Sequence, residues 1–476
     1  MQTRFPAPLL VARPTRPLAQ GLRWLVALSG LGLASLCWTG LLAADLVPPA
    51  RASLGVTSLA VGLWGSELLP LPVTAFLAVV LLFVTGAVGR LEQAFVGFSS
   101  PVLFFLLGTA ALGIAAEHTG LADRLATWLL VRSRGSGRRL LLELLVSLPL
   151  QALVVPSAIS RNAILVPVYE RVLDRLGRPP RLGAAVMLTL GVLGPVASSA
   201  VLSGGTSPVA TAQLLGGFTW LTWFVTLAPP YYVLLALGGL GIWWLHRPEP
   251  TSGLAVPDEL ARGGPWSAAE RRVALVTVGT AVLWVLDYVT HWPPAVPAML
   301  ALVVLLLPRA GVLDWHTFVS RAPWETCIVL AAAVSLAEAL TQTGAAAWVA
   351  RALFARFGAS QSVAIIALAI ILVTALITLA IPNRAAAITL VIPLATAYVA
   401  AGPLSGVAAG LIVMMVVDAE TLYPAQTAAN LLAYARGYFS AGQLVRFDLW
   451  LLISTAAVVL GVALPWWGVI GLPAGR

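Results

Sequence analysis

Lysine is absent from this 476-residue chain, and charged residues make up only 10% of it. Soluble domains carry about 25% charged residues, so this composition excludes a water-soluble globular protein. The net charge of +9 comes from arginines scattered between apolar segments, which excludes a nucleic-acid-binding protein. Cysteine occurs only at Cys37 and Cys327, so neither a disulfide framework nor a cysteine metal site is available.

Catalytic motifs are also missing. The sequence has no HExxH, CxxC or Walker-type glycine loop, and its four histidines are dispersed. We therefore predict no catalytic residue, no enzymatic activity and no organic cofactor.

Apolar residues dominate what is present. Hydrophobic residues make up 59% of the chain, and the mean hydropathy is +0.94. Many segments approach the roughly 20 apolar residues that span a bilayer, which predicts an all-α polytopic membrane protein. Residues 1–52 are interpreted as a cytoplasmic N-terminus followed by a first transmembrane helix at about 22–47, too long for a signal peptide.

The arginines predict the topology, because cytoplasmic loops are enriched in positive charge. Two clusters, at 132–139 and 171–181, flank one apolar stretch. If both clusters are cytoplasmic, residues 140–177 form a re-entrant hairpin, and the polar run Pro156–Asn162 interrupts it near the bilayer midplane. The same rule places the C-terminus outside and the protein in the cytoplasmic (inner) membrane.

The chain repeats itself once. Thr119-Gly recurs as Thr343-Gly, and Pro167 recurs as Pro393 at nearly the same spacing. We predict a first repeat at 53–246, a cytoplasmic linker at 247–272 and a second repeat at 273–476.

The second repeat has its own interrupted segment. Pro382–Ala385 divides the stretch 361–401, which the arginine count predicts to enter from outside. Hairpins from opposite faces indicate inverted-topology repeats, with about 11 transmembrane helices in total. Each half has one more polar break, at 203–208 and at 423–430.

Several motifs resemble those of the divalent anion/sodium symporter family of dicarboxylate and sulfate transporters. They are Trp64-Gly-Ser-Glu-Leu-Leu-Pro-Leu-Pro-Val-Thr-Ala, Phe98-Ser-Ser-Pro and Pro424-Ala-Gln-Thr-Ala-Ala-Asn. The resemblance implies an elevator-type homodimer in the lipid bilayer that moves a small divalent anion, with sodium as coupling ion. The family's Ser-Asn-Thr hairpin tips are replaced here by Ser157-Ala-Ile and Asn383-Arg-Ala.

Residues at the four breaks are the candidate site. Free N–H groups and the helix dipole at broken helices attract anions. The candidate anion-binding residues are Ser157, Ser160, Arg161, Asn162, Thr206, Ser207, Asn383, Arg384, Thr427 and Asn430. The candidate sodium ligands are Ser157, Gly204, Gly205, Asn383 and Ala425.

Arg161 and Arg384 lie within the membrane, where a charge is costly and is usually functional or paired. Each is a candidate for contacting the anion, for replacing the charge of a sodium ion, or for a buried ion pair. Asp418 and Glu420 are candidate partners of Arg384. The leading prediction is a sodium-coupled transporter, and the alternatives are a sodium-independent anion exchanger and an anion channel.

Overall fold

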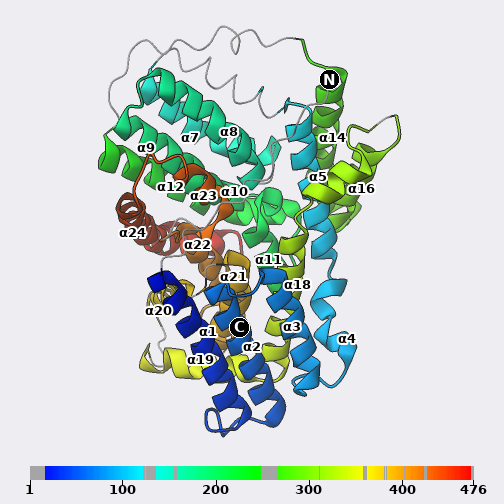
Figure 1. Cartoon of the computed structure of the whole chain (residues 1–476), viewed down its shortest axis with the longest axis vertical. Coiled ribbons are helices and arrows are strands. Elements are labelled where there is room, and N and C mark those ends of the chain that lie inside the picture. Colours follow the sequence, from blue (N-terminus) through cyan, green and yellow to red (C-terminus); the bar gives the residue numbers. More distant parts are fainter. Residues whose placement is uncertain are drawn as a thin grey trace.

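A computed structural model describes residues 17–121, 124, 136–154, 158–247, 265–309, 311–357, 362–379, 381, 383–400, 402–422 and 426–472. Within these ranges the chain consists of helices and turns and contains no strand. The predicted all-α class is therefore confirmed. Figure 1 shows α1, α2 and α3 toward one end of the long axis, with α7, α8 and α12 toward the other.

The N-terminal helices lead to one half of the molecule. They are α1 (Pro17–Trp38), α2 (Pro48–Ser66), α3 (Leu71–Val84), α4 (Leu91–Ala94), a 3-10 turn (Val96–Ser99) and α5 (Pro101–His118). Helix α1 ends at Trp38, nine residues before the end of the apolar run, because Gly40 takes a φ of +76° and turns the chain. Helices α1 and α2 cross at two glycines. A Cβ on Gly30 would lie 2.7 Å from Gly62 Cα.

The next helices contain the first two breaks. They are α7 (Gly137–Val154), α8 (Ala158–Arg175), α9 (Pro180–Leu188), a π turn (Thr189–Leu193), α10 (Gly194–Ser199), a 3-10 turn (Leu202–Gly204), α11 (Thr206–Leu215) and α12 (Trp220–His246). Residues 155–157, between α7 and α8, lie outside the described ranges. Helix α7 packs against α9 and α10, and α12 packs against α9, α10 and α24.

The remaining helices contain the other two breaks. They are α14 (Ala268–Val285), α15 (Asp287–Thr290), α16 (Ala295–Leu306), α17 (Trp315–Arg321), α18 (Trp324–Gln342), α19 (Ala345–Phe354), a 3-10 turn (Ala355–Phe357), α20 (Val363–Thr378), α21 (Arg384–Val399), α22 (Gly406–Ala419), α23 (Ala428–Tyr434), α24 (Ala441–Val458), a π turn (Val459–Ala463) and α25 (Leu464–Val469). Helix α14 begins inside the segment predicted as linker, because Ser267 and Glu270 form a capping box there. Arg124 Nε donates to Glu270 Oε1 at 2.9 Å and fixes this start.

Apolar length agrees with a polytopic membrane protein. Among the described residues, six helices are long and apolar enough to cross a bilayer. Helices α20, α21 and α22 are also apolar but shorter. Large side chains such as Leu22, Leu25 and Leu28 remain exposed on α1, as expected for a surface that faces lipid.

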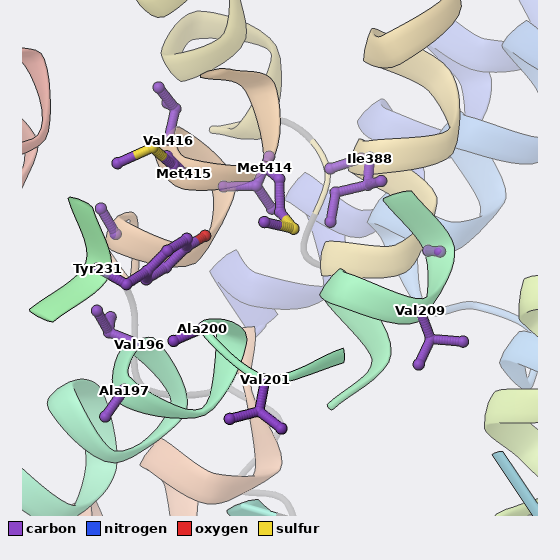
Figure 2. Packing of buried hydrophobic residues seen from close by; sticks show 14 of the residues in the cluster. Val196, Ala197, Ala200, Val201, Val209, Tyr231, Ile388, Met414, Met415 and Val416 are labelled. Carbon is purple, nitrogen blue, oxygen red and sulfur yellow. The ribbon is translucent and has the colours of Figure 1, made fainter. Parts of the chain in front are cut away.

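The interior is packed around the broken helices. Figure 2 shows Tyr231 of α12 between α10 and α22, with Val196 and Ala200 on one side and Met415 and Val416 on the other. All five side chains are buried. This packing fixes the ends of the broken helices relative to one another, which positions the site.

Candidate functional site

A cavity of about 380 Å³ lies where the breaks meet. Its lining includes Ala158 and Ile159, the segment Gly204–Pro208, the segment Asn383–Ala385, and Gln426, Thr427 and Ala429. These residues come from all four interrupted regions of the sequence. Segments more than 200 positions apart therefore meet at one cavity.

Three helices begin at this cavity. Ala158, Thr206 and Arg384 are the first residues of α8, α11 and α21, and each lines the cavity. The first N–H groups of a helix have no partner within the helix, and its N-terminus carries about half a positive charge. These N-termini favour an anion, whereas the carboxyl groups of Glu67 and Asp418, which also line the cavity, do not.

Glycine at position 204 allows the close approach of two backbone segments. A Cβ on Gly204 would lie 1.9 Å from the carbonyl oxygen of Ser198. The neighbouring Gly205 has extended backbone, and a Cβ there would meet no atom within 4 Å. Only the first of these two glycines is required by packing.

Seven predicted site residues line the cavity: Gly204, Gly205, Thr206, Ser207, Asn383, Arg384 and Thr427. Asn383 and Thr427 also cap helices. Asn383 Oδ1 accepts from Ala386 N at 3.0 Å, and Thr427 Oγ1 accepts from Asn430 N at 3.1 Å. Ser157, Ala425 and the side chain of Ser160 lie outside what the structure describes.

Arg384 reaches the cavity and is also paired. Its Nη2 donates to Thr421 Oγ1 at 2.8 Å and to the carbonyl oxygen of Asp418 at 3.1 Å. Its Nη1 lies 3.9 Å from Asp418 Oδ1. The predicted partner Asp418 is thus present, whereas Glu420 lies against the hydroxyl of Thr378. An anion in the cavity would meet a guanidinium that already has a carboxylate partner.

Arg161 is not among the residues that line the cavity. It is buried, and its Nη2 donates to Ser198 Oγ and, at 3.2 Å, to the carbonyl oxygen of Gly194. These bonds join α8 to α10. The placement favours the structural reading of Arg161 over direct contact with an anion in this cavity.

Asn162 and Asn430 are likewise buried behind the cavity wall. Asn162 Nδ2 donates to the carbonyl oxygen of Leu190 at 2.9 Å. Gly194 N bonds to Thr189 O in the π turn, and Pro195 has no N–H, so the Leu190 carbonyl has no helical donor at these positions. The Asn162 amide supplies the missing hydrogen bond, which explains an asparagine inside an apolar arm.

Sequence reasoning missed several polar residues of the lining. Thr109 of α5, Thr326 of α18, Ser199 of α10 and Gln426 all border the cavity. Gln426 lies inside a predicted break, so it could have been predicted from the sequence. The two threonines lie on uninterrupted apolar helices, where no local signal distinguishes them from ordinary helix residues.

Comparison with known proteins agrees with this architecture. The family model described as the sodium:sulfate symporter transmembrane region matches residues 33–472. The chain belongs to this family. The match covers all four breaks, so the family resemblance drawn from the motifs is confirmed.

Two of the similar proteins are named for dicarboxylates. The dicarboxylate transporter 2, chloroplastic, of Spinacia oleracea is 29% identical over 64% of this chain and 57% of its own length. The L-tartrate/succinate antiporter of Escherichia coli (strain K12) is 28% identical over 59% of this chain and 61% of its own. A protein named only as a membrane protein, from Cupriavidus necator, is 26% identical over 81% of this chain and 78% of its own. The matches to the first two thus span less than two thirds of those proteins.

Proposed function

We propose that the chain transports a small dicarboxylate, such as succinate or tartrate, across the membrane through the cavity described above. One observation carries the proposal: three helix N-termini and the Arg384 guanidinium converge on one cavity. A guanidinium fork matches the geometry of a carboxylate, and backbone N–H groups bind anions without a fixed counter-charge. Sulfate is a second substrate of the same chemical class, which the family description supports.

The transport mechanism that we propose is an elevator. Paired interrupted helices in two inverted repeats place a substrate site near the midplane, and alternating access then moves one part of the protein against another. The resemblance to the family supports a homodimer. The arginine distribution supports a cytoplasmic N-terminus, an external C-terminus and placement in the inner membrane.

The position of Arg384 favours transport that is not coupled to sodium. Arg384 supplies a fixed positive charge at the cavity, where a sodium transporter would bind a cation beside its anion. This corresponds to the sodium-independent alternative raised by the altered hairpin tips. Sodium coupling is the second candidate, because Gly204, Gly205 and Asn383 offer oxygen atoms, the ligand type that hard cations prefer, at the same cavity.

Reconstituted vesicles test the proposal. Vesicles are loaded with unlabelled succinate, tartrate or sulfate, and the uptake of labelled succinate is followed with and without external sodium. Counterflow of labelled succinate supports the proposed function. If the counterflow does not depend on sodium, transport without sodium coupling is supported. The absence of counterflow for every tested anion, or a current proportional to voltage as in a channel, would overturn it.

A further inference from the structure

Three carboxyl groups are buried around one guanidinium beside the cavity. Asp418 of α22, Glu420 directly after α22 and Asp448 of α24 are each at most 1% exposed. Arg384 interacts electrostatically with Glu420 and with Asp448. One positive charge cannot compensate three negative ones, and a buried ionised carboxylate without a partner is costly.

Asp418 is the carboxylate that Arg384 compensates. Its Oδ1 lies 3.9 Å from Arg384 Nη1, and its Oδ2 accepts a hydrogen bond from the Tyr231 hydroxyl at 2.8 Å. Asp418 is thus the ion-pair partner of Arg384, which still lines the cavity. Glu420 and Asp448 remain as two carboxyl groups without a cation of their own among the described residues.

Thr378 is the hydrogen-bond partner of Glu420. The Thr378 hydroxyl lies near Glu420 Oε2 and also within 2.9 Å of the Thr374 carbonyl and 3.1 Å of the Ala375 carbonyl. One hydroxyl hydrogen cannot serve all three oxygens, and threonines in apolar helices usually bond back to the preceding turn. The Thr378 hydroxyl, which donates to Glu420 Oε2, is therefore shared with two carbonyl groups, so it compensates a negative charge on Glu420 only in part.

Asp448 is the second group of the pair. Its Oδ2 accepts a hydrogen bond from the backbone N–H of Thr421, while its Oδ1 and Glu420 Oε1 are buried without hydrogen-bond partners. Glu420 and Asp448 are brought together at Thr421, which follows Glu420 in the chain and donates its N–H to Asp448. Two interacting carboxylates of this kind hold a proton more readily than either would alone. The unpartnered oxygens are sites where a proton can be gained or lost.

Among the described residues, the helices around this pair add no other compensating charge. Of the helices packed against α22, α10, α11 and α20 carry no titratable side chain, although Arg161 bonds to α10 from α8. The other titratable groups of α21, α24 and α12 are Tyr398, the exposed Arg446, Tyr232 and, at the far end of α12, His246.

Thr421 links this pair to the cavity. Its hydroxyl accepts from Arg384 Nη2, and its N–H donates to Asp448 Oδ2. Arg384 and Asp418 line the cavity, whereas Glu420 and Asp448 do not. An anion that draws on Arg384 weakens the positive potential at Glu420 and Asp448, which favours a proton there. By thermodynamic linkage, a proton bound there favours the anion to the same extent.

We propose that Glu420 and Asp448 form a proton-binding site and that net dicarboxylate uptake is coupled to protons through it. The pair takes a proton from water on the side where the anion binds and returns it to water on the side where the anion leaves. No other reactant is consumed. The inference rests on the proposed dicarboxylate transport. It names the proton as the coupling ion of a transporter in which Arg384 takes the place of sodium.

Vesicles containing a pH-sensitive dye test the proposal with succinate as substrate. Wild-type protein is expected to acidify the lumen as succinate enters, and an inward proton gradient is expected to accelerate uptake. Glu420→Gln and Asp448→Asn are each expected to retain succinate counterflow and to lose proton-driven uptake by about tenfold or more, within the usual range of coupling between two sites. Glu338→Gln changes an exposed carboxylate of α18 and is the matched control, expected to behave as wild type.

Three results would overturn the proposal: no proton movement with the wild-type protein, proton-driven uptake that survives both substitutions, or uptake driven by sodium alone. Survival in both variants would mean that succinate itself carries the proton. Size-exclusion profiles and thermal midpoints show whether each variant is folded, and the wild-type dye signal tests the coupling even if one variant is not. Loss of counterflow in the wild type would instead contradict the underlying transport function.

Discussion

Asn162 Nδ2 donates to the carbonyl oxygen of Ala429 at 3.0 Å, across 267 positions of the sequence. The same amide donates to Leu190 O in the π turn. One buried side chain therefore joins α8, the α9–α10 segment and α23. Both acceptors are main-chain carbonyls, so these two hydrogen bonds of Asn162 hold the walls of the cavity together.

Asn162→Ala should destabilise the protein. The substitution leaves two buried carbonyl groups without this donor, and each unsatisfied group costs about 1–3 kcal/mol. We expect a lower thermal midpoint in detergent and a lower transport rate, with less folded protein per cell. An unchanged midpoint would show that water replaces the amide at both carbonyls.

Arg384→Gln should weaken anion binding and also lower the stability of the fold. The substitution removes the cavity guanidinium and leaves Asp418 buried without its cation, and truncating one partner of such a pair costs about 2–5 kcal/mol. We expect succinate affinity, measured by calorimetry, to fall by at least about tenfold.

The double variant Arg384→Gln/Asp418→Asn separates the two effects of that change. It removes the unpaired charge, so its thermal midpoint should lie above that of the single variant while succinate binding stays weak. Recovery of binding in the double variant would contradict a contact between Arg384 and the anion.

Arg161→Gln should lower the stability of the fold and leave anion affinity nearly unchanged. This guanidinium bonds to Gly194 O and Ser198 Oγ behind the cavity wall, so its loss should lower the thermal midpoint. Succinate affinity of the folded fraction should change by less than about threefold, since no direct contact is removed. A large loss of affinity without a loss of stability would assign Arg161 to the anion site after all.

Gly204→Ala and Gly205→Ala form a matched pair. A Cβ at 204 would lie 1.9 Å from Ser198 O, and relief of this clash requires the backbone of the cavity wall to move. A Cβ at 205 meets nothing within 4 Å. We expect Gly204→Ala to lower both midpoint and transport, with overpacking costs of about 1–3 kcal/mol, and Gly205→Ala to stay close to wild type. Equal effects would contradict the packing argument.

The four breaks were predictable because proline, glycine and polar residues interrupt long apolar segments, and their recurrence in both halves predicted that they belong to one site. The partner Asp418 was also predictable, since few carboxylates lie within apolar segments. The roles of Arg161 and Asn162 were not predictable in this way. The sequence does not show which face of α8 points to the cavity, because polar and charged residues lie along this helix outside the cavity as well. The Glu420–Asp448 pair depends on the packing of α24 beside the end of α22, which no local pattern encodes.

The crossing of α1 and α2 at Gly30 and Gly62 has a consequence for the lipid environment. In the bilayer, lipid acyl chains can replace the contact between the two helix surfaces. The helices are therefore held together by close van der Waals packing rather than by exclusion of water. Apart from the ion pair between Arg23 Nη2 and Glu67 Oε2 at 3.4 Å, their association should therefore respond little to salt or pH. It should depend instead on bilayer thickness and chain order, which makes the choice of detergent or lipid decisive for keeping α1 in place.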